Sequence, residues 1–214
     1  MSDIIKSQRE RSSYRHGDLR RALLDAGIAL ARVGGPEAVV LREATRQAGV
    51  VPNAAYRHFA SQQELLQAVQ AYALSALAMS METELAKLDS SGQLTEFARG
   101  SLRAVGTGYL RFAYVEPGLF RTAFSPPAAI DASPDPAKAG NSGLNPFQLL
   151  SAALDRMVDA NFLPAERRPG AEYLAWSAVH GLALLFTDGP MRTAAPAYRD
   201  AIGQRLLDMV EQGL

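Results

Sequence analysis

The sequence contains no cysteine and no apolar run long enough to cross a membrane. Without cysteine the chain can build neither a disulfide scaffold nor a thiol active site, and this composition fits a reducing compartment. The longest apolar candidate, residues 173–187, is too short to span a bilayer as a helix. Residues 1–17 are polar and lack the apolar core of a secretion signal. We therefore expect a soluble, cytoplasmic protein with no membrane partner.

The chain also lacks net charge, but its charges are unevenly distributed. Residues 1–60 hold ten Lys and Arg against six Asp and Glu, whereas residues 61–214 hold twelve against sixteen. A basic end on an acidic remainder is typical of a protein that binds a polyanion such as nucleic acid. An ordinary solvated surface gives the same pattern, so charge alone leaves both interpretations open.

Strand-like alternation is absent, and apolar residues recur at helical spacing, which predicts an all-α fold. Capping and stop signals place several boundaries: Ser61 and Glu64 form a capping box, Pro117 ends a helix, and Asn145 precedes another. Helices are expected over residues 18–33, 41–48, 52–59, 62–88, 94–115, 145–161, 169–187 and 196–212. Residues 125–143 are rich in Pro, Ala, Ser and Gly, which predicts a long flexible loop. That loop is either a plain connector or a functional lid.

The stretch EATRQAGVVPNAAYRHF, residues 43–59, has the spacing of a helix-turn-helix. Gly49 stands where the chain must turn sharply, at a position that favours a residue tolerating positive φ. Thr45 is small, as two closely crossing helices require, and Val50 and Ala55 are placed to pack inward. A helical hairpin inside a bundle would have the same spacing, so the motif alone does not establish its function.

In a DNA-binding helix-turn-helix, the second helix enters the major groove. The spacing then directs Asn53 and Arg57 to base edges, where Asn suits adenine and Arg suits guanine. Tyr56 and His58 would flank this helix and reach phosphates, which position the protein without specifying sequence. Phe59 would turn back into the core.

The wider segment YRHGDLRRALLDAGIALARVGGPEAVVLREATRQAGVVPNAAYRHFASQQELLQAV, about residues 14–70, resembles the DNA-binding domain of the TetR family of bacterial transcriptional regulators. The resemblance implies a homodimer, usually a repressor, that binds a palindromic operator on double-stranded DNA. It also implies a flexible arm over residues 1–13, a DNA-binding domain over 14–60, and a ligand-binding and dimerisation domain over 61–214. The expected DNA contacts are Arg15, His16, Arg42, Pro52, Asn53, Ala54, Tyr56, Arg57 and His58.

Two departures from the family pattern affect the phosphate contacts. The family usually has Ser or Thr capping its second and third helices, where this chain has Val40 and Val51. Its common Lys after the aromatic pair is Gln62 here. Main-chain N–H groups would then make some of these contacts, and Arg15, His16 and Arg20 would supply part of the missing charge.

The C-terminal segment EYLAWSAVHGLALLFTDGP, residues 172–190, resembles the Trp-His-Gly subclass of TetR-family C-terminal domains, with Trp176, His180 and Gly181 as its signature. Together with the aromatics near Pro117, the resemblance implies a small-molecule pocket for a largely apolar effector. The expected lining is Tyr109, Phe112, Phe120, Phe124, Trp176 and His180. Core packing is the competing explanation for each of them, His180 included.

The last two expected helices predict that two copies of the chain associate. Residues 173–187 are apolar on every face, so one face needs a partner, and residues 202–210 carry an apolar stripe. A four-helix seam between two copies would bury both, although burial within one bundle explains either helix alone. The expected interface is Ala175, Ala178, Leu182, Ile202, Leu206 and Met209.

No catalytic, metal or cofactor site is expected. The three histidines, at 16, 58 and 180, lack metal-ligand spacing, and no Ser-centred elbow is present. Gly106 and Gly108 lie in a helical pattern with no preceding strand, so they do not form a dinucleotide loop and instead let a helix or ligand approach. A helical small-molecule carrier or enzyme with an incidental helix-turn-helix is the alternative, followed by a protein-interaction bundle.

Overall fold

The computed structural model describes residues 19–89, 93–126 and 133–214, and all regular structure in these ranges is helical. The predicted all-α fold is therefore confirmed for this part of the chain, and none of its helices is long and apolar enough to cross a membrane. After a helix over residues 19–34 come η1 (Pro36–Ala38), α2 (Leu41–Gln47), α3 (Pro52–Ala55), α4 (Gln62–Leu85), α5 (Leu94–Val115), α6 (Pro117–Ala123), η2 (Pro136–Lys138), α7 (Pro146–Asp159), η3 (Ala165–Arg167), α8 (Ala171–Thr187) and α9 (Pro196–Gly213), where η marks a 3-10 helix.

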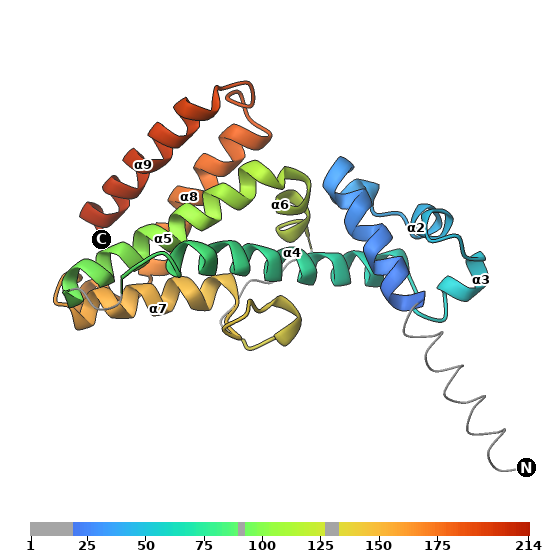
Figure 1. Ribbon diagram of the computed structural model, residues 1–214, viewed down its shortest axis with the longest axis horizontal. Helices are drawn as coiled ribbons and strands as arrows, with labels where there is room; N and C mark the ends of the chain where they lie inside the picture. Colours follow the sequence, from blue (N-terminus) through green and yellow to red (C-terminus); the bar gives the residue numbers. More distant parts are fainter. Residues whose placement is uncertain (1–18, 90–92, 127–132) are drawn as a thin grey trace, which may run out of the picture.

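The molecule is elongated, and α4 runs from one part into the other (Figure 1). The helix of residues 19–34 forms a small unit with α2 and α3 at one end, while α5, α6 and α7 pack against α4, and α8 and α9 pack against α5. The small unit has its own core, in which Leu23, Val39, Ala55 and Phe59 are fully buried. This unit corresponds to the segment in which the sequence predicts a helix-turn-helix.

Local capping chemistry sets several boundaries as the sequence predicts. The Ser61 hydroxyl accepts a hydrogen bond from the Glu64 N–H at 3.1 Å and so starts α4. Asn145 and Gln148 form a reciprocal capping box that starts α7. The α5 helix spans the predicted residues 94–115, and Pro117 begins α6 immediately afterwards.

Close helix contacts in the bundle depend on the two glycines of α5. A Cβ added at Gly108 would lie 2.5 Å from the Cα of Met81, so α4 and α5 pack backbone to backbone there. A Cβ at Gly106 would meet the Leu207 side chain of α9 at 2.4 Å. Of the two alternatives for these glycines, the approach of another helix accounts for Gly108, and no room for a ligand remains there.

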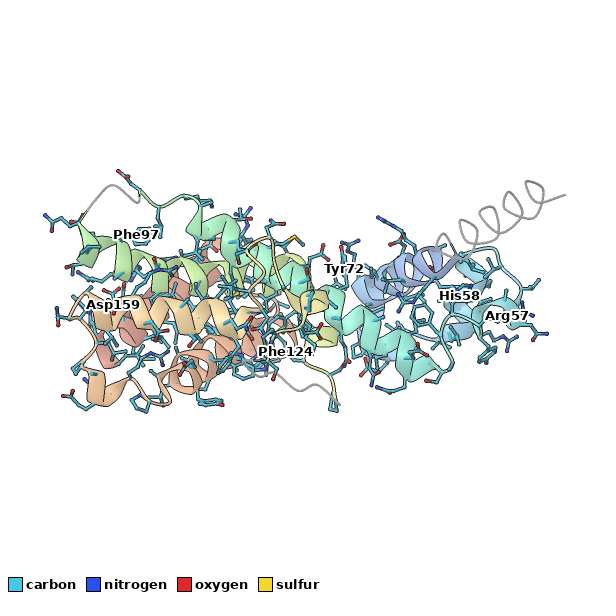
Figure 2. The ribbon with its side chains drawn as sticks, turned by 90° about the horizontal axis from the view of Figure 1, so that it is seen from below. Arg57, His58, Tyr72, Phe97, Phe124 and Asp159 are labelled. Carbon is cyan, nitrogen blue, oxygen red and sulfur yellow. The ribbon has the colours of Figure 1, made fainter. Side chains whose placement is uncertain are left out.

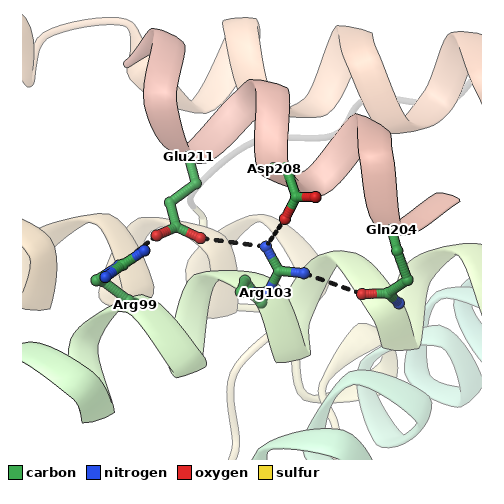
Figure 3. Close-up of polar contacts among 5 residues, drawn as sticks. All are labelled: Arg99, Arg103, Gln204, Asp208 and Glu211. Atoms are coloured by element: carbon green, nitrogen blue, oxygen red, sulfur yellow. Dashed lines mark hydrogen bonds and ion pairs between the residues drawn. The ribbon is translucent and has the colours of Figure 1, made fainter.

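Charged side chains fasten α9 to α5 (Figure 3). Arg103 donates to Glu211 at 3.2 Å and to Gln204 at 3.0 Å, and it also pairs with Asp208. Arg99 pairs with the same Glu211 carboxylate, which is almost fully buried. Because a buried carboxylate is stable only when it is paired, this network fixes where the last turns of α9 lie on α5.

Two predicted segments differ in the structure. The third helix is shorter than residues 52–59: α3 ends at Ala55, and tighter turns continue to Phe59, with the His58 N–H bonded to the Ala55 carbonyl at 2.9 Å. The N–H groups of Arg57 and His58 bond to carbonyls three residues back, whereas the Phe59 N–H bonds four residues back to the Ala55 carbonyl at 3.0 Å, and Phe59 is buried in the core.

The predicted flexible loop over 125–143 is only partly described, since residues 127–132 lie outside the described ranges. Its later part lies against α4: the Glu82 carboxylate accepts the N–H groups of Asn141 and Ser142, each at 2.8 Å. The Ser75 hydroxyl donates to the Ala139 carbonyl at 2.6 Å. Residues 133–143 are therefore fixed to α4, which corrects the prediction of a flexible loop for that part.

Candidate functional site

The turn between α2 and α3 has the backbone geometry that the sequence predicts. Gly49 has φ 67°, in the left-handed region that favours glycine, and nothing crowds the position where a Cβ would stand. The Val50 N–H bonds to the Thr45 carbonyl at 3.2 Å and closes the turn. Thr45 is buried, with its hydroxyl donating to the Leu41 carbonyl at 2.6 Å. The helix-turn-helix is thus present as predicted.

The outer side of this motif carries the polar residues expected to contact DNA. Asn53, Tyr56 and Arg57 are exposed, whereas Ala55 and Phe59 are fully buried beneath them. Arg57 and His58 lie at one end of the molecule, opposite the end that holds Phe97 and Asp159 (Figure 2). An exposed polar side on a firmly packed inner side is what a recognition surface requires.

The other expected DNA contacts are only partly visible. Arg42 is exposed on α2, and Ala54 is partly buried on α3. Arg15 and His16 lie outside the described residues, as does the arm of residues 1–13, and the side chain of Pro52 is not described. Val40 precedes α2 and gives no side-chain cap, as predicted, so the first N–H groups of α2 remain available to a phosphate.

Within the bundle, a chain of hydrogen bonds links three of the expected pocket residues. The Trp176 Nε1–H donates to the Tyr109 hydroxyl at 3.0 Å, and this hydroxyl lies 2.7 Å from His180 Nδ1. Phe124 packs against His180 with ring centroids 4.8 Å apart, and Phe120 packs against Tyr109 at 5.6 Å. Five of the six predicted pocket residues therefore form one aromatic cluster.

Burial determines the protonation of this cluster. It raises the pKa of Tyr109 well above its ordinary value, despite the opposing effect of the Trp176 hydrogen bond, so the phenol keeps its proton. Burial lowers the pKa of His180, which favours the neutral imidazole. A neutral imidazole has one nitrogen that can accept a hydrogen bond from the Tyr109 hydroxyl, whereas a protonated imidazole has none.

We expect this cluster to make stability depend on pH. Because the pKa of His180 is lower in the folded chain, its contribution is complete above the unfolded value of about 6.5 and is lost as pH falls below it. The melting temperature of the wild type should therefore fall more steeply between about pH 7 and about pH 5 than that of His180→Gln, which keeps an acceptor without titrating there. Parallel melting curves for the two proteins would contradict this assignment.

An internal cavity of about 40 Å³ lies beside the cluster. Its walls are almost entirely apolar and come from α4 to α9: Leu74, Met81, Leu102, Arg103, Val105, Gly106, Tyr109, Phe124, Pro146, Phe147, Leu150, Ala175, Trp176, Val179, Leu207 and Val210. Typical small-molecule sites measure about 300–1,000 Å³, so an effector in this cavity requires its walls to move apart.

The remaining expected pocket residues lie elsewhere. Phe120 and His180 line a separate open groove of about 410 Å³, together with Phe124, which borders both spaces. Phe112 is buried but borders neither of them, so its placement in the pocket lining was wrong. It lies three positions from Tyr109 on α5, and helical spacing alone does not show which of two buried faces meets a cavity.

Part of the predicted association surface also faces inward. Ala175 lines the cavity and Leu182 is buried, so both are covered by their own bundle, which corrects their assignment to a dimer interface. Ala178, Ile202 and Leu206 are partly buried, and Met209 is exposed. The outer side of α8 exposes Leu174, Gly181, Leu184 and Leu185 instead.

The α6 helix connects the bundle to the DNA-binding unit, and it lies between them (Figure 1). Its Gly118 packs so closely that an added Cβ would lie 2.2 Å from the Ala31 carbonyl oxygen. At its start, the Glu116 carboxylate accepts from Arg32 Nε at 3.1 Å. Arg121 donates to Asp188 at the end of α8 at 2.9 Å and also lies beside Gly35. This connection was not predicted from the sequence, where Pro117–Gly118 directly after a long helix was the available signal.

Two segments of the chain match families of known proteins. Residues 23–69 match the family described as "Bacterial regulatory proteins, tetR family", and residues 102–210 match "Tetracyclin repressor-like, C-terminal domain", which alone covers just over half of the chain. The chain belongs to the TetR family. As a TetR-family protein it is a DNA-binding transcriptional regulator, and the assignment points to a transcription factor rather than an enzyme. The narrower resemblance to the Trp-His-Gly subclass stays a prediction.

Solved structures share the TetR-family fold. A protein of unknown function from a Rhodococcus species is 24% identical, with a TM-score of 0.71 over 92% of this chain and 95% of that one. The TetR-family transcriptional regulator PfmR from Thermus thermophilus is 20% identical, with a TM-score of 0.55 over 90% of this chain and 98% of that one. No curated protein matches the chain. At these identities the similarity supports the fold and not a particular operator or effector.

Proposed function

We propose that this TetR-family protein is a homodimeric repressor that binds a palindromic operator and is released by a small, largely apolar effector. The observation that best supports DNA recognition is the exposure of Asn53, Tyr56 and Arg57 above a buried inner side formed by Ala55 and Phe59. Side chains held by a packed core can meet base edges and phosphates without first being ordered.

Selection of bound sequences from a random DNA pool tests this proposal. A homodimer with one recognition unit per copy should enrich two inverted half-sites whose centres lie a whole number of helical turns apart. Enrichment of a single asymmetric site, or of no sequence at all, would contradict a dimeric repressor of this kind.

The base contacts assign a separate role to each exposed residue. Arg57 offers a planar pair of donors to the O6 and N7 atoms of guanine, and Asn53 offers a donor and an acceptor to adenine. Tyr56 has one hydroxyl, which suits a phosphate oxygen. The short α3 leaves Arg57 in the turn that follows it, so its side chain reaches DNA from the end of the helix.

We expect Arg57→Ala to relax operator specificity at one base step, at a cost of about 1–3 kcal/mol, because the guanine loses its two donors. Binding competition among single-base operator variants would measure this effect. Tyr56→Phe should instead weaken binding to all sequences alike. Arg111→Ala removes the same charge from the bundle, far from α3, and serves as the control. An unchanged base preference in Arg57→Ala would place the recognition contact on another residue.

The effector part of the proposal depends on movement of the bundle. An effector that fills the apolar cavity must separate α5 from α7, α8 and α9, since the space is small. Two connections can transmit this change to the DNA-binding unit, namely the continuous α4 and the packing of α6 on residues 31–35. The effector must bind one spacing of the two recognition units more tightly than the other, because equal affinity would shift nothing.

The dimer part of the proposal rests on the outer side of α8 and α9. Leu174, Leu185 and Met209 are exposed apolar side chains on these helices, and Gly181 lets another helix approach closely. Two copies related by a two-fold axis would cover this surface with the same surface of the partner and so form a four-helix seam.

A further inference from the structure

The open groove of about 410 Å³ lies where the DNA-binding unit meets the bundle. It is bordered by η1, α6 and α8, and its lining is Pro36, Glu37, Phe120, Arg121, Phe124, Ser125, His180 and Leu184. Phe124 also borders the internal cavity, so one aromatic side chain lines both spaces. A molecule in the groove would therefore contact both the DNA-binding unit and the aromatic cluster.

The hydrogen bonds of the cluster determine which nitrogen of His180 carries the proton. The Tyr109 hydroxyl accepts from Trp176, whose indole nitrogen can only donate. The buried Tyr109 proton then has one acceptor in the described structure, His180 Nδ1 at 2.7 Å. Leaving that proton without an acceptor would be costly, so Nδ1 accepts and the neutral ring carries its proton on Nε2.

The groove therefore offers a hydrogen-bond donor. Within the described residues, His180 Nε2 has no partner, and His180 belongs to the groove lining. Arg121 also lines the groove; its Nη1 donates to Asp188, and its Nε is buried from solvent and so is not offered to a ligand. The Ser125 hydroxyl is already engaged with Gln70 and with the Thr122 carbonyl.

The charges around this donor argue against a free carboxylate. The positive charge of Arg121 is balanced by Asp188 at 2.9 Å, and the Glu37 carboxylate borders the same groove. The net charge around the groove is therefore neutral to negative, which disfavours an anionic ligand. A carbonyl oxygen can instead accept a hydrogen bond from an N–H without adding charge.

We propose that this groove binds the carbonyl oxygen of an uncharged, apolar carbonyl compound such as an aryl ketone, with His180 Nε2–H as the donor and Tyr109 as the positioning residue. The inference rests on the proposed effector function and names the chemical class of its ligand. Because Phe124 borders both spaces, an effector whose carbonyl oxygen lies in the groove can extend its apolar part toward the internal cavity. The apolar body of the compound would lie against Phe120 and Phe124. Tyr109 itself is excluded as the donor to the carbonyl oxygen, because its one proton is donated to His180 Nδ1 within the cluster.

Three small probes of similar size separate the alternatives: acetophenone, ethylbenzene and benzoate. Trp176 is the only tryptophan of the chain and stands in the hydrogen-bonded cluster, so its fluorescence reports binding directly. We expect acetophenone to bind about three- to tenfold more tightly than ethylbenzene, as one added hydrogen bond allows, and benzoate to bind more weakly than acetophenone.

Nitrogen NMR of the full-length wild-type protein gives an independent measurement. The chain has three histidines, so the His180 signals can be assigned by substituting one residue. We expect Nδ1 to be unprotonated and Nε2 protonated in the free protein. Acetophenone should perturb the Nε2 signal, and ethylbenzene should not.

Tyr109→Phe tests the positioning role. The variant keeps the ring but removes the proton given to Nδ1, so His180 is no longer held with its proton on Nε2. The preference for acetophenone over ethylbenzene should fall toward equality. Tyr72→Phe removes a phenol from α4 outside the cluster and should keep the preference of the wild type.

Equal affinity for acetophenone and ethylbenzene, tighter binding of benzoate, absence of binding by acetophenone, or a proton on Nδ1 would each overturn the proposal. None of these outcomes depends on DNA. The proposed repressor function is judged separately by the selected operator, so the two failures are distinguishable.

Discussion

If two copies pair through α8 and α9 as proposed, Leu185→Glu should leave the protein monomeric and abolish tight operator binding. Leu185 is 43% exposed in the single chain, so a glutamate there is solvated until two copies associate. At a two-fold seam the change would bury two unpaired carboxylates, which should weaken association by about 3–5 kcal/mol, roughly a 200- to 5,000-fold rise in the dimer Kd. Sedimentation velocity measures the association, and an operator titration measures its consequence.

Leu94→Glu is the matched control for this prediction. It places the same charge at a leucine that is 81% exposed at the start of α5, on neither of the two helices of the proposed seam. This control should remain dimeric and bind the operator normally. If Leu185→Glu dimerises at the same protein concentrations as the wild type, α8 does not form the seam.

Gly118→Ala should disconnect the bundle from the DNA-binding unit. The added methyl group would meet backbone atoms of residues 31 and 32, the nearest at 2.2 Å, and no flexible side chain can move aside to accommodate it. Either α6 or the helix of residues 19–34 must shift. The expected loss in the free energy of unfolding is about 3 kcal/mol, near the upper end of the range typical of overpacked cores. Denaturant unfolding measures the loss of stability, and hydrogen exchange of residues 19–34 shows where it occurs.

The same variant should respond less to an effector, since α6 is one of the two connections between the units. A typical coupling of about 1–3 kcal/mol would decrease while operator affinity without effector is largely kept. Gly100→Ala is the control, because its methyl group meets only the end of the Leu88 side chain, at 3.2 Å. An unchanged response in Gly118→Ala would leave α4 as the sole connection.

The parts of the fold that local chemistry determines were predictable from the sequence. Several helix boundaries are specified by residues that lie next to them in the sequence, and the structure confirms them. These residues are the caps Ser61 and Asn145 and the proline after α5. The positive φ of Gly49 is equally local, because the turn requires it whatever surrounds it. These features depend on neighbours in sequence rather than on tertiary packing.

The orientation of apolar residues could not be predicted in the same way. The α8 helix is apolar on every face, so helical spacing could not show that Ala175 and Leu182 face the bundle while Leu185 faces outward. Phe112 was misplaced for the same reason. The membership of the aromatic cluster was predictable, but the order of its hydrogen bonds depends on distances between α5 and α8 that no sequence pattern contains.

The inner sides of α8 and α9 form a wall of the cavity, through Trp176 and Leu207, while their outer sides carry the surface proposed for dimerisation. The charged network on α5 leaves α9 little freedom to shift along that helix alone. In the proposed dimer, an effector that widens one bundle would therefore push on the helices of the other copy. The second binding event would then meet a protein already altered by the first, and release from DNA would follow a dose-response curve whose steepness differs from that of two independent sites.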